Sequence, residues 1–153
     1  MRTVSFRSVA LVGAAMLGIA ALSTQAGSPS PTDANKALVK QFFHAVETRN
    51  KELVVKIVRE DYIQHMPGIP TGRASILNYI DMVAPKGQGT EPVFRRVIAE
   101  GDLVVVQFRR EDQKGPVAVV ETFRIQGGQI AEHWAVTETI PPEDKARNKN
   151  GMI

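Results

Sequence analysis

The sequence predicts an α+β domain in which helices come first and a meander of antiparallel strands follows. Three segments between residues 32 and 83 carry apolar side chains at three- and four-residue spacing, which is typical of amphipathic helices. From Glu91 onward the period changes to two, with β-branched residues and short separators, which indicates strands joined by hairpins. Because helical and strand segments are segregated along the chain, we expect them to form separate layers of one domain.

The first helix is expected to begin at Thr32 or Asp33, either of which can cap it, and to end near Arg49. Asn50 can cap a shorter second helix, and Thr71 a third. The stretch before the third helix is rich in proline and glycine and is expected to be extended before it turns into a loop. Strands are expected at residues 93–99, 103–109, 117–125 and 130–137.

The N-terminus has the layout of a secretory signal peptide at residues 1–26. Arg2 and Arg7 precede an apolar run at residues 9–22. Small residues follow this run, and cleavage is expected after Ala26. The apolar run is shorter than the roughly 20 residues that span a bilayer, so we expect no stable membrane anchor after cleavage. The sequence therefore predicts a periplasmic or secreted protein.

The rest of the chain is expected to consist of a flexible leader at residues 27–31, a folded domain at 32–140 and a polar C-terminal tail at 141–153. The absence of cysteine excludes disulfides, so the domain must be stabilised by its core. The net charge is only +3, and the sequence has no basic stripe interleaved with aromatic residues. We therefore expect no nucleic-acid partner.

Glu121 is the position that points most clearly to chemistry. Two-residue alternation along its predicted strand places it on an apolar face, with Val117, Val119, Phe123 and Ile125. Burying an unpaired charge costs several kcal/mol or more, so such a carboxyl group is normally paired, protonated or at the wall of a wet cavity. The other face could instead lie on the core, but it carries the more solvent-tolerant residues. We therefore expect Glu121 to face a pocket.

The turn around Gly127 decides which residue of the next strand meets Glu121. A two-residue turn puts Trp134 opposite Glu121, whereas a three-residue loop with a glycine bulge puts Ala135 there and turns His133 to the same face. The spacing alone leaves both registers open, and a partly exposed strand histidine is the alternative to a pocket role for His133.

The further polar candidates for the pocket are Tyr62, His65 and Gln107. His65, shortly after Tyr62, lies in the loop-forming stretch, where binding groups often occur, although a surface histidine beside a proline turn fits equally. Gln107 can project an amide into the cavity or mark a sheet edge. The histidines lack metal-binding spacing, and no phosphate loop, nucleophile elbow or dinucleotide fingerprint is present, so neither a metal nor an organic cofactor is expected.

Several blocks of the sequence, in this order, resemble the SnoaL-like branch of the NTF2-like superfamily, which includes polyketide cyclases and predicted aldol-condensation proteins. They lie at residues 61–67 (DYIQHMP), 72–73, 121–125, 128–134 and 148–152. The resemblance implies a cone in which a curved antiparallel sheet wraps around three N-terminal helices and encloses a central pocket. It also implies a homodimer formed through the outer face of the sheet.

The resemblance also implies where the site lies and where this chain departs from the family. An aspartate usually precedes the aromatic residue in the block at Glu121, and the block at His133 usually reads His-Trp-Asp. Here the latter aspartate is replaced by Ala135, which cannot transfer a proton, and Glu121 is the carboxylate that remains. The family pattern favours the bulged turn, with His133 and Ala135 pointing inward.

The sequence thus predicts an exported pocket protein that acts as a cofactor-free isomerase or lyase of the cyclase or aldol type. Glu121 would remove a proton next to a carbonyl group, and His65, Tyr62 or His133 would donate a hydrogen bond to the enolate oxygen. The expected pocket walls are Phe42, Phe43, Phe123 and Trp134. The alternative is a non-catalytic binding protein for a hydrophobic small molecule, because one fold hosts both functions.

Overall fold

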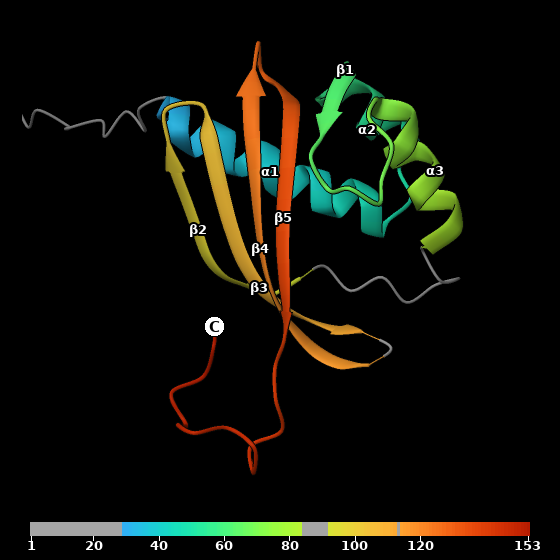
Figure 1. The fold of residues 1–153 in the computed structure, drawn as a ribbon. Helices are drawn as coiled ribbons and strands as arrows, with labels where there is room; N and C mark the ends of the chain where they lie inside the picture. Colours follow the sequence, from blue (N-terminus) through green and yellow to red (C-terminus); the bar gives the residue numbers. More distant parts are fainter. Residues whose placement is uncertain (1–28, 84–91, 113) are drawn as a thin grey trace, which may run out of the picture.

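Helices and strands form two layers in the computed structural model, which describes residues 29–83, 92–112 and 114–153 (Figure 1). The expected signal peptide lies outside the described residues. In chain order the elements are α1 (Pro31–Glu47), α2 (Lys51–Ile57), β1 (Val58–Gln64), α3 (Arg73–Val83), β2 (Phe94–Glu100), β3 (Leu103–Asp112), β4 (Gly115–Gln126) and β5 (Gln129–Thr139). Among the described residues, no helix is both long and apolar enough to cross a membrane.

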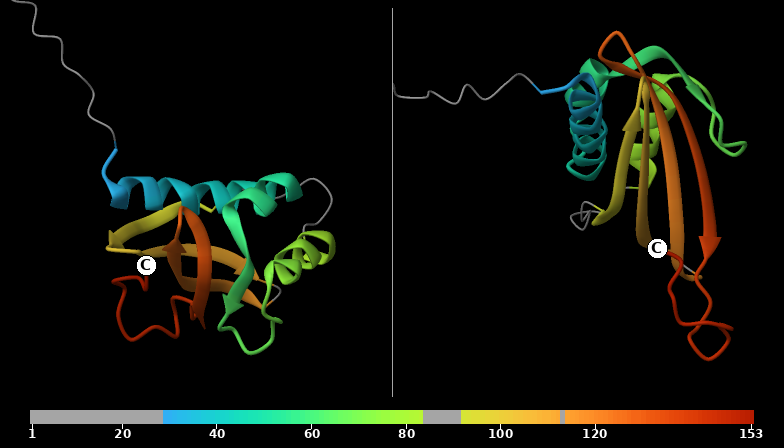
Figure 2. Two further views of the ribbon diagram at one scale, coloured as in Figure 1. Left: turned by 90° about the horizontal axis from the view of Figure 1, so that it is seen from above. Right: turned by 90° about the vertical axis from the view of Figure 1, so that its left-hand side faces the viewer.

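The strands form one curved sheet in the order β1-β5-β4-β3-β2. Strands β2 to β5 are the antiparallel meander that the sequence predicts. The extended piece before the proline-rich loop becomes β1, which adds to the free edge of β5 in parallel orientation. Figure 2 shows α1 lying across one face of the sheet, with α3 beside β1. This arrangement confirms the α+β fold and defines an inner, helix-covered face and an outer face of the sheet.

Polar side chains at the start of α1 and α2 accept hydrogen bonds from backbone N–H groups of the first helical turn. Ser30 caps α1, because its Oγ accepts a hydrogen bond of 3.2 Å from the backbone nitrogen of Asp33. The expectation of a cap at Thr32 or Asp33 is therefore wrong: Pro31 already fits the first helical position, where no N–H is needed. Asn50 caps α2 as predicted, accepting from the Leu53 nitrogen at 2.9 Å.

Thr71 fastens the loop after β1 to that strand and does not cap α3. Its Oγ1 accepts a hydrogen bond from the Gln64 nitrogen at 3.0 Å and donates to the Tyr62 carbonyl oxygen at 3.2 Å. The helix α3 starts later, at Arg73. These two bonds hold the end of β1 in place.

A cluster of phenylalanines joins α1 to the sheet. Phe43 is at its centre, with ring centroids 5.0 Å from Phe94 and 5.5 Å from Phe108 in edge-to-face geometry. Phe42 and Phe123 complete the cluster, with centroids 5.5 Å apart. Phe42, Phe43 and Phe123 were expected as pocket walls, and the structure buries all three in this core.

The hairpin between β4 and β5 combines features of both registers that the sequence left open. A two-residue turn pairs Ile125 with Ile130, and the register then shifts by one because Ala131 is an extra residue on β5. Ile130 and Ala131 are both buried, although they are consecutive on a strand. Beyond the bulge Glu121 lies opposite Ala135, which is the pairing that the family resemblance favours.

Candidate functional site

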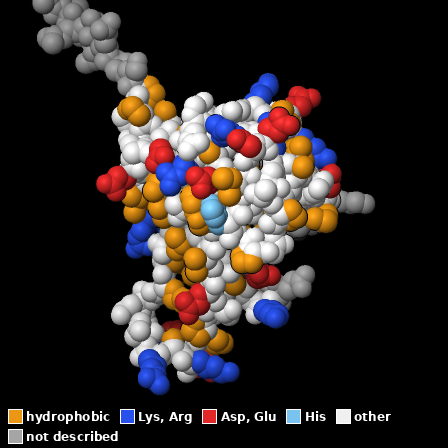
Figure 3. All heavy atoms as spheres, turned by 45° about the horizontal axis from the view of Figure 1, so that its top comes forward, with side chains coloured by type: hydrophobic (Ala, Val, Ile, Leu, Met, Phe, Trp, Pro, Cys, Tyr) orange, Lys and Arg blue, Asp and Glu red, His pale blue; other side chains and the backbone are white. Residues whose placement is uncertain are grey.

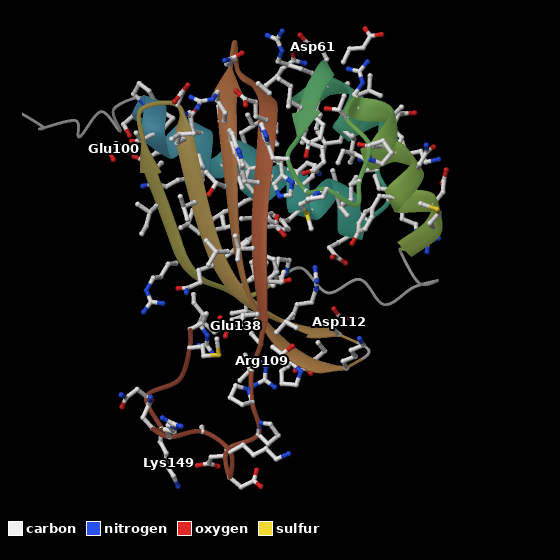
Figure 4. The ribbon with its side chains drawn as sticks, in the orientation of Figure 1. Asp61, Glu100, Arg109, Asp112, Glu138 and Lys149 are labelled. Atoms are coloured by element: carbon white, nitrogen blue, oxygen red, sulfur yellow. The ribbon has the colours of Figure 1, made fainter. Side chains whose placement is uncertain are left out.

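Glu121 lies on the inner face of β4, between the fully buried side chains of Val119 and Phe123. Its side chain is only 12% exposed. Other ionisable side chains, such as Glu100, Asp112 and Glu138, lie toward the ends of their strands (Figure 4). The alternation predicted from the sequence thus places this carboxyl group in an apolar part of the sheet.

His133 is the direct partner of Glu121. Its Nε2 lies 3.1 Å from Oε2 of Glu121, and its side chain is 9% exposed. Its ring also packs against Phe123, its cross-strand neighbour, with centroids 4.8 Å apart. The structure therefore brings together two of the three residues predicted as catalytic, and the pair is largely removed from water.

The network continues from His133 to β1. Nδ1 of His133 lies 3.1 Å from Oε1 of Gln64, and Nε2 of Gln64 donates to the hydroxyl oxygen of Tyr62 at 3.1 Å. Tyr62 is fully buried, and this burial, with the charge of Glu121 as a second cause, raises the pKa of Tyr62 well above its ordinary value. Tyr62 is therefore a neutral end of the chain Tyr62–Gln64–His133–Glu121.

The second carboxyl oxygen of Glu121 remains open. Within the described part of the chain, Oε1 of Glu121 accepts no hydrogen bond, whereas Oε2 is bonded to His133. No side-chain oxygen of those residues is both buried and unpaired, so Oε1 borders open space, either at the surface or in a cavity. A carboxylate with one oxygen held and the other reachable can exchange a proton with a bound molecule.

Tyr79 on α3 is half-buried, and besides this burial the charge of Glu121 is one of the causes that shift its pKa. Burial is the main cause that raises the pKa of Tyr79; the charge of Arg110 lowers it and that of Glu121 raises it. The phenol therefore keeps its hydrogen at neutral pH and can donate a hydrogen bond. The sequence pattern did not single out Tyr79 as a site residue, because Tyr79 also fits the apolar stripe of its helix, beside the buried Ile76 and Ile80.

The remaining predicted site residues lie on the outer face, which corrects their expected roles. The His65 ring stacks on Trp134, with centroids 4.3 Å apart, and its Nε2 lies 3.0 Å from Glu132. Gln107 accepts a hydrogen bond from Arg96 on the neighbouring strand β2. Successive strand residues point to opposite faces, so none of His65, Trp134 and Gln107 can reach Glu121.

The described residues contain no group of three or more His, Asp or Glu side chains placed to hold a metal ion. The inner-face network is instead made of one carboxyl, one imidazole, one amide and one phenol group. These groups can move protons and orient one another. The site is therefore a candidate for acid–base chemistry.

The chain belongs to the SnoaL-like domain family, whose profile matches residues 39–133. A candidate ketosteroid isomerase from Kribbella flavida superposes with a TM-score of 0.63 at 18% identity, covering 79% of this chain and 93% of that one. A candidate polyketide cyclase, IdmH from Streptomyces antibioticus, gives a TM-score of 0.56 at 16% identity, covering 68% and 91%. TsrD from Streptomyces laurentii gives 0.56 at 17% identity, covering 69% and 88%.

At these identities the likeness to the solved structures defines the fold. No curated protein matches the chain. The family and the fold agree with the predicted SnoaL-like, NTF2-like architecture, and the function has to be argued from the site.

Proposed function

We propose that this protein is a cofactor-free acid–base catalyst that acts on a carbonyl compound, as an isomerase or a cyclase or aldol-type lyase. The observation that carries the proposal is the carboxylate of Glu121, which is paired with His133 through one oxygen and has no partner at the other among the described residues. Relatives by fold include a candidate ketosteroid isomerase and a candidate polyketide cyclase, which is in keeping with this class of reaction.

The proposed step is removal of a proton from the carbon next to the carbonyl group. The C–H bond breaks, the proton bonds to Oε1 of Glu121, and the electron pair forms the enolate, with its negative charge on the carbonyl oxygen. Return of the proton to another carbon gives isomerisation, and attack of the enolate carbon on a second carbonyl carbon gives an aldol-type ring closure. His133 stabilises the charged carboxylate through Oε2 before the step.

The donor to the enolate oxygen differs from the one expected. Both ring nitrogens of His133 are engaged, Nε2 by Glu121 and Nδ1 by Gln64, so His133 has no hydrogen left for a ligand. Tyr62 is fully buried and His65 lies on the outer face. We therefore assign the donor role to Tyr79, and one well-placed donor typically contributes about 3–4 kcal/mol to transition-state stabilisation.

The alternative function is a binding protein for a hydrophobic small molecule. Ala135, at the position where the family resemblance implies an aspartate, lies directly opposite Glu121 and cannot transfer a proton. Val106, on the other side of Glu121, adds an apolar neighbour. An apolar surface with one carboxylate can hold a ligand by burial and a single polar contact.

Proton exchange separates the two functions. Carbonyl compounds that differ in size are incubated with the wild-type protein in D2O, and deuterium at the carbon next to the carbonyl is measured by NMR. A catalyst exchanges that proton faster than buffer, whereas a binding protein shows bound ligand without exchange. Mass spectrometry of molecules that co-purify with the protein from its native compartment supplies the first compounds for the panel.

The proposed place of action is the periplasm or the extracellular space. Arg2, Arg7 and the apolar run at residues 9–22 support export, and Ala26 is the residue before the proposed cleavage site. Mature protein isolated from its native cells is expected to begin near Gly27. An intact N-terminus beginning at Met1 would contradict this proposal.

We also propose that a second copy of the chain covers the outer face of the sheet. Ile98, Val120 and Val136 are exposed there, and hydrophobic side chains gather on that side of the molecule (Figure 3). Arg109 on β3 and Glu138 on β5 both lie beside the central strand β4. A twofold axis parallel to the strands would set the arginine of one copy against the glutamate of the other. Light scattering is expected to give the mass of a dimer, and a monomer at high concentration would refute this.

A further inference from the structure

We propose that Gln64 is a positioning residue, which keeps a hydrogen on Nδ1 of His133 and so leaves a single shared proton between Nε2 of His133 and Glu121. The inference rests on the proposed function for its catalytic meaning, but the state of the histidine ring can be measured without any substrate. Gln64 lies in a block that carries the family resemblance but is not among the site residues that the sequence predicts, and its role follows from the hydrogen bonds on the inner face of the sheet.

The orientation of the Gln64 amide follows from its other two partners. The backbone N–H of Met66 can only donate, and it lies 3.0 Å from one end of the amide, which must therefore be the oxygen Oε1. The amide nitrogen Nε2 then donates to the Tyr62 hydroxyl oxygen at 3.1 Å. The network thus assigns which end of the amide faces His133.

Since Oε1 of Gln64 is an acceptor, its 3.1 Å contact with His133 requires a hydrogen on Nδ1. In the neutral ring, Nε2 then carries a lone pair, and the hydrogen in its 3.1 Å contact with Oε2 belongs to Glu121. In the charged ring that hydrogen is on Nε2 and Glu121 is a carboxylate. The two arrangements contain the same number of protons, and only the second leaves Glu121 as a base.

The backbone holds Gln64 in the place that this role requires. Gln64 and His133 are register partners in the parallel β1–β5 pair, and the nitrogen of the next residue, His65, donates to the His133 carbonyl oxygen at 2.9 Å. Thr71 accepts from the Gln64 nitrogen at 3.0 Å. Because both the backbone and the side-chain amide are tied, the acceptor for Nδ1 is fixed in position before a ligand binds.

The test is the state of the His133 ring in solution. The chain contains three histidines, so their ring ¹⁵N signals can be assigned by replacing His44 and His65 one at a time. In the wild type, Nδ1 of His133 is expected to show the shift and coupling of a protonated nitrogen. In Gln64→Leu, which has similar size but no acceptor, the neutral ring is expected to move to the Nε2–H form. Gln107→Leu, on the outer face, is the matched control and leaves the His133 signals unchanged.

A second variant keeps the proposal testable if Gln64→Leu does not fold. Gln64→Glu retains an oxygen for Nδ1 and adds a negative charge, so it is expected to keep Nδ1 protonated and to favour the charged ring. Unchanged His133 signals in Gln64→Leu, or loss of the Nδ1 hydrogen in Gln64→Glu, would overturn the proposal.

The catalytic consequence is measured separately. Partners that orient a metal-ligating histidine typically contribute about 10–100-fold to activity, and we expect an effect of that size for this histidine. Gln64→Leu is therefore expected to lower kcat for proton exchange by that factor with KM nearly unchanged. Gln64→Glu is expected to recover part of the rate. If the wild type exchanges no proton, the proposed function fails, while the ring measurement still decides the role of Gln64.

Discussion

Replacing Glu121 by glutamine is expected to slow proton exchange at the carbon next to a carbonyl by about 10²–10⁴-fold, the usual contribution of a general acid or base. Glutamine has nearly the same shape and can keep an oxygen toward His133, but its amide cannot take up a proton at neutral pH. Because Glu121 is held between Val119 and Phe123 on the inner face, the apolar surroundings of the ligand stay the same. Binding of the compound is therefore expected to persist.

Exchange rates by NMR and ligand affinity by calorimetry check this prediction together. Glu132→Gln is the matched control, because Glu132 is also a partly buried carboxylate on the sheet but contacts His65 and Arg124 on the outer face. That variant is expected to exchange at the wild-type rate. Equal rates in Glu121→Gln and wild type would show that another group is the base. Loss of exchange in Glu121→Gln, even with tighter binding of apolar compounds, would be consistent with Glu121 as the base.

The position of Glu121 could be predicted from the sequence because strand alternation is a local signal. Residues two apart on a strand share a face. An apolar row interrupted by one carboxylate can therefore be recognised without knowledge of the rest of the fold. The core helices were predictable for the same reason, since the spacing of Phe42 and Phe43 with their neighbours is read within a few turns. These features depend on sequence neighbours only.

The partners of Glu121 depend on contacts that leave no local signal. Gln64 and His133 are 69 positions apart, and they meet because β1 pairs with β5 in parallel. No hairpin turn in the sequence predicts this pairing. The face of His133 depends on one extra residue, Ala131, inserted after a tight turn. The same one-residue parity sends His65 and Trp134 to the outer face, although both stand next to inner-face residues in the sequence.

Replacing His133 by leucine is expected to lower the free energy of unfolding by about 3–5 kcal/mol, the usual cost of removing one partner of a buried charge pair. The two side chains are 9% and 12% exposed, so little water can replace the lost contact at Oε2 of Glu121. Leucine leaves Oε2 of Glu121 without its hydrogen bond and Oε1 of Gln64 with only the Met66 donor. The larger part of the cost comes from the carboxylate, because an uncompensated buried charge costs more than a neutral group that loses one of two bonds.

A double-mutant cycle separates that cost from a simple packing defect. Adding Glu121→Leu to His133→Leu removes the stranded carboxylate, and the double variant is expected to be as stable as His133→Leu or more stable, although it carries one more change. Urea unfolding at neutral pH measures all four proteins. Strict additivity of the two single effects would mean that Glu121 and His133 do not interact in solution, and the acid–base pair would then lose its physical basis. Strong coupling would show that the two groups interact in the folded protein. A double variant more stable than the wild type would show in addition that the pair is kept at a cost in stability, as is expected when it is retained for chemistry and not for folding.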